Sequence, residues 1–141
     1  IINCYNSEKF LKQCIKSVLS QTYKNWEIIF FDNNSSDQSV KILNSFIDKR
    51  IKFFNNKKRN HLKLYKARNL AINKANGEYI TFLDTDDMWK KNKLEKQIKL
   101  IVKDPDIKII YSNYLVIDEN KKKFILNIKK SYHQDLLHKS F

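Results

Sequence analysis

Glycine and proline are nearly absent from this sequence of 141 residues, which contains one of each, Gly77 and Pro105. With a single glycine, neither the dinucleotide-binding pattern G-x-G-x-x-G nor the phosphate-loop pattern G-x-x-x-x-G-K-[ST] can be written. The sequence therefore excludes a dehydrogenase built on the first pattern and a P-loop enzyme built on the second.

Cysteines and long apolar runs are also scarce. Cys4 and Cys14 are the only cysteines, and with three histidines they form no C-x-x-C or H-x-x-x-H pattern, so we predict no zinc site and a reducing, cytoplasmic setting. No stretch approaches the roughly 18 apolar residues that a membrane span needs, and no signal-peptide pattern is present. The only methionine is Met88, and the sequence opens directly on an apolar run, so we expect a fragment.

Acidic residues are outnumbered, with 28 Lys+Arg against 15 Asp+Glu and a formal net charge of +13. Such a charge draws a protein toward phosphate-rich surfaces, which include nucleic acid, anionic lipid and phosphorylated substrates. Only three of the basic residues are arginines, and the lysines are scattered along the chain, which favours a solvated surface over a nucleic-acid-reading stripe. A basic nucleic-acid-binding module remains the alternative, because Phe53, Phe54 and Tyr65 lie near basic residues.

Short apolar runs alternate with amphipathic stretches. We predict strands at 1–4, 26–31, 51–54 and 79–83, the last one buried, and helices at 8–21, from Ser35 to about 47, at 65–75 and at about 94–102. Ser35 and Gln38 have the spacing of a capping box, and Asn76-Gly77 is expected to end the third helix with a left-handed cap. Residues 107–117 are strand-like, and 119–123 suggest a hairpin into 124–128.

This alternation predicts an α/β fold, a three-layer sandwich with a mainly parallel central sheet and right-handed crossovers. In such sheets, ligands bind beyond the carboxyl ends of the strands. Residues 3–6, 32–34 and 84–87 each follow an apolar strand, so we expect these polar segments to converge at one edge of the sheet.

The cluster Asp84-Thr85-Asp86-Asp87 is the strongest chemical signal. Three carboxylates within four residues repel one another unless a cation compensates them. Mg²⁺ or Mn²⁺ would do so, since these ions prefer oxygen ligands and are usually held by one or two carboxylates completed by phosphates and water. An acidic turn that caps the next helix is the alternative for such a cluster taken alone.

Four blocks of sequence resemble the inverting GT-A glycosyltransferases of family 2, in the order and spacing of that family. They are Ile2-Asn3-Cys4-Tyr5-Asn6 with the helix that follows, Trp26 to Asp37, Ala67-Arg68-Asn69, and Gly77 to Trp89. The resemblance covers residues 1 to about 111. It implies a GT-A (Rossmann-like) fold that is incomplete at its C-terminal end, with a nucleotide-sugar-binding core at 1–111 and the start of an acceptor-side region at 112–141, in one partial domain over 1–141.

The resemblance also implies roles for individual residues. Tyr5 would pack beside the nucleotide base, the backbone at Cys4 would meet the base edge, and Asp32 lies in the same nucleotide-binding block. Asn33 stands where the family usually has an aspartate that accepts the base N3 hydrogen. Arg68 would lie along the nucleotide. Asp84 would lie near ribose and metal, with Asp86 as the principal metal ligand and Asp87 beside it.

The implied reaction transfers a sugar from a nucleotide diphosphate, with UDP-sugars the foremost candidates, to the hydroxyl of a saccharide or lipid-linked acceptor, with inversion. Such a reaction serves cell-surface polysaccharide or lipopolysaccharide synthesis. In the family the catalytic base lies on a later segment, so this chain is expected to bind donor without transferring sugar. The expected place is the cytoplasm, and the lysines leave open a peripheral position on the inner face of an anionic membrane.

Overall fold

The computed structural model describes residues 1–56, 60–117 and 123–126. The chain forms two compact units, Ile1–Lys103 and Asp104–Phe141, and each is described by itself. The boundary predicted after residue 111 stays a prediction. No helix in the described part of the chain is both long and apolar enough to cross a bilayer.

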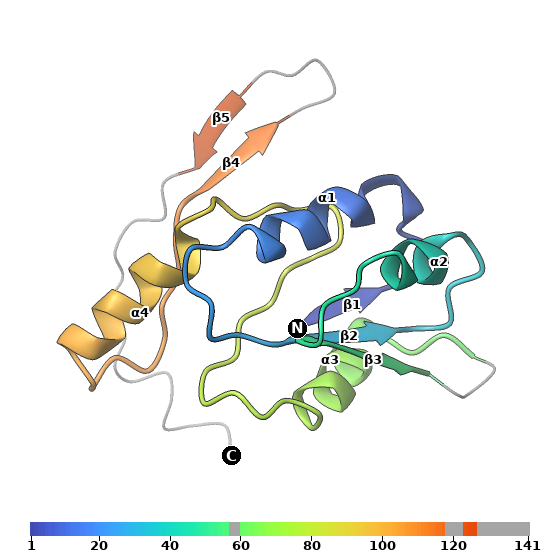
Figure 1. Ribbon diagram of the computed structural model, residues 1–141, viewed down its shortest axis with the longest axis horizontal. Helices are drawn as coiled ribbons and strands as arrows, with labels where there is room; N and C mark the ends of the chain where they lie inside the picture. Colours follow the sequence, from blue (N-terminus) through green and yellow to red (C-terminus); the bar gives the residue numbers. More distant parts are fainter. Residues whose placement is uncertain (57–59, 118–122, 127–141) are drawn as a thin grey trace. The chain divides into compact units, whose positions relative to one another are not determined.

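Three parallel strands form the centre of the first unit (Figure 1). They are β1 (Ile2–Cys4), β2 (Ile28–Asp32) and β3 (Ile51–Asn55), in the spatial order β1-β2-β3. The register pairs Cys4 with Asp32, and Asp32 with Asn55, so the three strands end level with one another. All five residues of β2 are buried, as expected for a continuous apolar run in the middle of a covered parallel sheet.

Helices cover both faces of this sheet, as Figure 1 shows. They are α1 (Glu8–Leu19) and α2 (Ser39–Asn44) on one face and α3 (Leu64–Ile72) on the other. Successive residues of a strand point to opposite faces, so Ile28 and Phe30 join the core beneath α1, whereas Ile29 and Phe31 pack against α3. The predicted three-layer α/β sandwich is confirmed.

The start of α2 differs from the prediction. The helix begins at Ser39 and not at Ser35, and no local capping box forms. The two helix starts on this face cap each other instead: Asp37 accepts the Glu8 N–H at 2.9 Å and the Ser39 N–H at 2.9 Å, while the Glu8 carboxylate accepts the Gln38 N–H at 2.9 Å. Because the two segments that cap each other are 30 residues apart in the sequence, no local sequence pattern predicts this capping.

The predicted buried strand at 79–83 is wrong in its burial and is not a regular strand. The segment runs beside β1: the Ile1 amino group donates to the Thr81 carbonyl at 2.7 Å, and the Leu83 N–H donates to the Ile1 carbonyl at 3.0 Å. Leu83 is buried in the core beneath α1, but Tyr79, Ile80 and Phe82 are exposed. An apolar run indicates which residues can be buried, but burial itself requires a neighbouring element. Within the described residues, Phe82 is covered only in part, by the Arg68 guanidinium 5.3 Å from its ring centroid.

Two smaller expectations also need correction, and a third is confirmed. The helix α2 ends at Asn44, which leaves Ile47 fully exposed and outside the core. The helix α3 ends at Ile72 with a right-handed C-cap at Asn73, and Gly77 has no positive φ, so it is not a left-handed cap. The amphipathic helix predicted near 94–102 exists as α4 (Lys93–Lys103), although none of its residues is fully buried.

One buried side chain ties α4 to the end of α1. Gln21 is fully buried, and its amide nitrogen donates to the Ser17 carbonyl at 3.1 Å and the Lys90 carbonyl at 2.9 Å. Its amide oxygen accepts the Leu94 N–H at 3.1 Å. The side chain therefore satisfies the Leu94 N–H, one of the first-turn donors that a helix itself leaves free.

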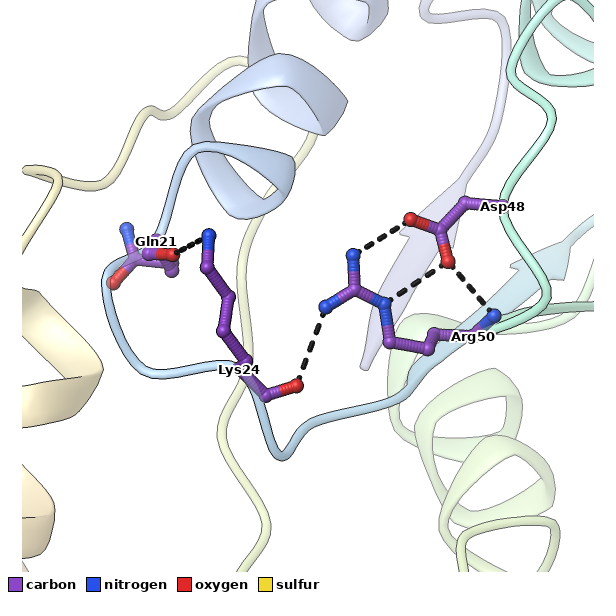
Figure 2. A network of polar contacts seen from close by, with 4 residues as sticks. All are labelled: Gln21, Lys24, Asp48 and Arg50. Atoms are coloured by element: carbon purple, nitrogen blue, oxygen red, sulfur yellow. Dashed lines mark hydrogen bonds and ion pairs between the residues drawn. The ribbon is translucent and has the colours of Figure 1, made fainter.

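A network of polar contacts joins the segments that precede β2 and β3, at the end of the sheet opposite its carboxyl edge (Figure 2). The Arg50 guanidinium makes two hydrogen bonds to the Asp48 carboxylate, at 3.0 and 2.7 Å, and one to the Lys24 carbonyl at 3.2 Å, and the Arg50 N–H also donates to that carboxylate at 2.9 Å. Its guanidinium also lies 3.6 Å from the ring centroid of Trp26. The Lys24 ammonium in turn donates to the Gln21 carbonyl at 2.7 Å. These contacts hold the chain segments that enter the two strands.

The second unit contains a two-stranded antiparallel sheet, β4 (Tyr114–Ile117) with β5 (Lys123–Leu126). This pairing confirms the predicted hairpin, although residues 107–113 are not strand as expected. The predicted turn at 119–122 and the end of the second strand at 127–128 lie outside the described residues.

Candidate functional site at the carboxyl edge of the sheet

Three polar segments meet at the carboxyl edge, as the sequence predicts. The Asn33 N–H donates to the Cys4 carbonyl at 2.8 Å, which joins the segments after β1 and β2. The Thr85 hydroxyl donates to the Ser7 hydroxyl at 2.8 Å, and the Cys14 thiol donates to the Asp84 carbonyl at 3.6 Å. These contacts hold the acidic segment 84–87 against α1 and against Ser7, the residue that follows the first polar segment.

Two asparagines shape the loops of this edge. Asn6 and Asn34 are the only non-glycine residues with positive φ in the described part of the chain, at 48° and 71°. Asparagine is among the residues that best tolerate this conformation. The Asn6 carbonyl oxygen Oδ1 accepts the Ser36 N–H at 2.8 Å, and the Asn6 N–H donates to the Ser35 hydroxyl at 3.0 Å. The sequence analysis did not single out this role, although an asparagine just after each strand is a usable signal.

Asp32 is buried at the end of β2, and its carboxylate serves the loop that follows. Its two oxygens accept the Ser35 N–H at 3.1 and 3.4 Å. Its backbone carbonyl accepts the Asn56 N–H at 2.8 Å. In this structure, Asp32 therefore holds the loop in shape.

The Asn33 side chain is also buried, with 4% of its surface exposed, and it is hydrogen-bonded to residues of the loop after β3. Its Nδ2 donates to the Leu62 carbonyl at 2.8 Å, and its Oδ1 accepts the Leu62 N–H at 3.0 Å. Asn56 Nδ2 donates to the same Oδ1 at 3.3 Å and to the Asn60 carbonyl at 2.9 Å. Both lone pairs of the Asn33 amide oxygen are thus in use.

A small pocket of about 70 Å³ opens beside this amide. It is lined by Asn3, Cys4, Tyr5, Asn33, His61, Leu64 and Ala67. Tyr5 is half-exposed, and its ring centroid lies 4.1 Å from that of His61, with the planes tilted by 55°. The pocket therefore contains Cys4, Tyr5 and Asn33 from the predicted site, together with Asn3 and His61, which the sequence analysis had not assigned to it.

The acidic segment carries negative charge that is only partly compensated. Asp84 forms an ion pair with Arg68, with Nη2 and Oδ1 2.7 Å apart, while Asp86 and Asp87 are exposed. Partial burial, together with the neighbouring charges of Asp86 and Asp84, raises the pKa of Asp87 above its ordinary value. The structure thus joins Arg68 to Asp84, as expected of two residues of one site.

A metal ion at the acidic segment would be held by few protein ligands. Among the described residues, no group of three histidine, cysteine or carboxylate side chains is placed to share one ion. Exposed carboxylates with unpaired negative charge do fit the mode in which Mg²⁺ is held by one or two carboxylates and by substrate phosphates. Asp84 and Asp86 are the residues that would hold it.

A covered parallel sheet with polar loops converging beyond its carboxyl ends defines the class of α/β proteins that bind ligands at this edge. Sequence comparison identifies the family: residues 1–139 match Glycosyl transferase family 2, and the chain belongs to it.

Curated relatives agree with this assignment. A UDP-Glc:alpha-D-GlcNAc-diphosphoundecaprenol beta-1,3-glucosyltransferase, WfgD of Escherichia coli, is 40% identical over 136 residues, which are 95% of this chain and 53% of the relative. Glycosyltransferase GlyG of Streptococcus pneumoniae is 34% identical over 88% of this chain and 41% of its own length. The chain thus spans about half the length of the curated relatives it matches.

Solved structures confirm the GT-A fold. The structure of TarS 1-349 from S. aureus matches with a TM-score of 0.68 and 28% identity, over 72% of this chain and 31% of that one. TarS 1-349 in complex with UDP matches with a TM-score of 0.65 and 27% identity, over 73% of this chain and 31% of that one.

Proposed function

We propose that this chain is the donor-binding part of a glycosyltransferase that moves a sugar from a nucleotide diphosphate to an acceptor hydroxyl with inversion. The observation that carries the proposal is the meeting of three motif-bearing segments at one sheet edge, where Arg68 reaches Asp84 at 2.7 Å and the pocket forms beside Tyr5 and Asn33. UDP is the proposed nucleotide, because two of the matched TarS structures are complexes with UDP and with UDP-GlcNAc.

Each residue of the edge would have a defined part. Tyr5 would support the base, the Cys4 backbone and Asn33 would face the base edge, and Asp32 would keep their loop in place. Arg68 would offer its guanidinium donors to the nucleotide.

Asp84 and Asp86, with Asp87 next to them, would hold Mg²⁺ or Mn²⁺. A divalent ion there would offset the charge that develops on the departing diphosphate. The three carboxylates would then lie beside the phosphate end of the donor, and the ion would compensate the repulsion among them.

The acceptor and the cellular role are proposed from the relatives. WfgD is named for an acceptor on diphosphoundecaprenol, so a saccharide or lipid-linked acceptor and a part in cell-surface polysaccharide synthesis are proposed here. A cytoplasmic place fits this chemistry. The net charge of +13 favours peripheral contact with an anionic membrane, and cosedimentation with anionic and neutral liposomes tests that contact.

Binding experiments separate this function from a nucleic-acid-binding module. The glycosyltransferase requires UDP binding that is strengthened by Mn²⁺, whereas the module requires binding of short DNA or RNA that weakens steeply with salt. Salt-sensitive DNA binding without any uptake of UDP would refute the proposal.

Transfer itself is a separate matter. We propose that this chain binds donor but does not transfer its sugar, because the carboxylate base of the family lies on a later segment. Detectable transfer to any acceptor by the chain would contradict this second statement and leave donor binding intact.

A further inference from the structure

The Asn33 amide presents a carbonyl oxygen and an NH₂ group side by side, and both are bound to the peptide groups of a single residue. The Leu62 N–H donates to Asn33 Oδ1 at 3.0 Å, and Asn33 Nδ2 donates to the Leu62 carbonyl at 2.8 Å. Two hydrogen bonds in opposite directions between the same pair of groups make a closed, complementary contact.

The edge of a uracil or thymine base offers the same pair of groups. Its N3–H is a donor and the adjacent carbonyl is an acceptor, so this edge can replace the Leu62 N–H and C=O on the Asn33 amide with no group left unpaired. An aspartate at this position has no donor and could accept only the N3–H.

The space beside the amide is too small for a nucleotide as it stands. The pocket measures about 70 Å³, while sites for small molecules are roughly 300–1,000 Å³. His61 narrows it, since its ring lies against Tyr5 with centroids 4.1 Å apart. Tyr5 is the residue expected to support the base, so His61 and Leu62 together occupy the neighbourhood that a base would take.

A second, independent feature of the pocket indicates a ligand with an acceptor group. Asn3 lines the pocket, and its Nδ2 is buried without a hydrogen-bond partner within the described residues. A buried donor without a partner is costly, and a ligand carbonyl would relieve it.

We propose that the Leu62 peptide groups occupy the face of Asn33 that receives the imide edge of a uracil or thymine base, so that donor binding exchanges Leu62 for the base. This inference rests on the proposed function. It makes Asn33 a residue that selects the base, and it makes the 60–62 segment an internal competitor whose removal strengthens nucleotide binding.

The test compares wild type with Leu62→Pro, which removes the N–H donated to Asn33 and leaves Asn33 itself unchanged. UDP with Mn²⁺ is titrated into each by calorimetry, and inorganic pyrophosphate with Mn²⁺ serves as the probe without a base. Because one internal hydrogen bond no longer competes, UDP affinity should rise about tenfold in the variant. Pyrophosphate affinity should stay the same.

Amide hydrogen exchange on the wild-type chain tests, without any substitution, whether UDP replaces Leu62 as the partner of Asn33. Saturating UDP should speed exchange of the Leu62 amide, because Asn33 Oδ1 no longer accepts from it, while amides of the core slow down or stay constant. This measurement also covers the case in which Leu62→Pro does not fold.

The outcomes separate the two claims. UDP binding that is unchanged or weaker in Leu62→Pro, or a Leu62 amide that becomes more protected with UDP, overturns the exchange and leaves the proposed function standing. Failure of the wild-type chain to bind either UDP or pyrophosphate in the presence of Mn²⁺ overturns both.

Discussion

Replacing Gln21 with leucine should destabilise the first unit by an amount that its contacts allow us to work out. The side chain is fully buried, and it makes three hydrogen bonds to backbone groups of Ser17, Lys90 and Leu94. The Ser17 carbonyl keeps a partner, because the Ser20 hydroxyl also donates to it at 3.0 Å. The Lys90 carbonyl also keeps a partner, because the Lys93 N–H donates to it at 2.9 Å. Leucine therefore leaves one of these three groups without its partner, the Leu94 N–H.

Each buried backbone group left unpaired costs about 1–3 kcal/mol. Lys90 is exposed, so water can reach part of this site, and the leucine side chain regains some apolar burial. We therefore expect Gln21→Leu to lower the free energy of unfolding by about 1–2 kcal/mol, out of the roughly 5–15 kcal/mol typical of a domain. For a unit of this size, that corresponds to a fall in Tm of roughly 5–15 °C.

Urea and thermal unfolding, followed by circular dichroism, measure this change. Gln13→Leu is the matched control, since Gln13 is exposed on α1, the helix that ends just before Gln21, and its change should stay within about 0.5 kcal/mol. Equal stability of the two variants would refute the role given to Gln21.

Three further predictions concern the site and the ionisable groups. Asp84→Asn should change the free energy of unfolding by less than about 1 kcal/mol, because its ion pair with Arg68 is largely exposed. The same variant should weaken Mn²⁺-assisted UDP binding about tenfold, the equivalent of one charge-assisted contact, whereas unaffected binding would remove Asp84 from the site. Burial raises the pKa of Cys14 to about 12 and also raises the pKa of Cys4. Neither thiol should therefore react with a disulfide reagent at pH 8 until denaturant is added. Rapid labelling of the folded protein would contradict their burial. Hydrogen bonds from the neighbouring arginine lower the pKa of Asp48 to about 2, so its contribution to stability is complete above about pH 4 and is lost as the pH falls toward 2. The stability difference between wild type and Asp48→Asn should therefore disappear over that range, and a difference that persists at pH 2 would show that the carboxylate charge is not its source.

The layered fold could be predicted because it depends on local periodicity. The run that became β2 is apolar without interruption, and α1 repeats its buried residues at helical spacing. Strand ends then place residues 3–6, 32–34 and 84–87 at one edge without further information. This reasoning was enough to bring Tyr5, Asn33 and Cys4 to the same pocket.

Features that depend on distant partners could not be predicted in this way. The Glu8 N–H and the Gln38 N–H, at the starts of α1 and α2, are capped by carboxylates 29 and 30 residues away, so the local Ser35–Gln38 spacing misplaced the start of α2. The contact of Asn33 with Leu62 joins residues 29 apart through a loop that has no periodic pattern. The exposure of Tyr79 depends on what lies over it, which its own apolar segment does not specify.

The central claim is that the acidic segment after residue 83 supports metal-assisted binding of a nucleotide diphosphate. Calorimetric titration of UDP, with Mn²⁺ and then with a chelator, tests it on the wild-type chain, on Asp86→Ala and on Asp106→Ala as an exposed acidic control. The account predicts that Mn²⁺ strengthens UDP binding in wild type and in Asp106→Ala, and that this gain is lost in Asp86→Ala. Equal gains in all three proteins, or no UDP uptake by folded wild type, would contradict it.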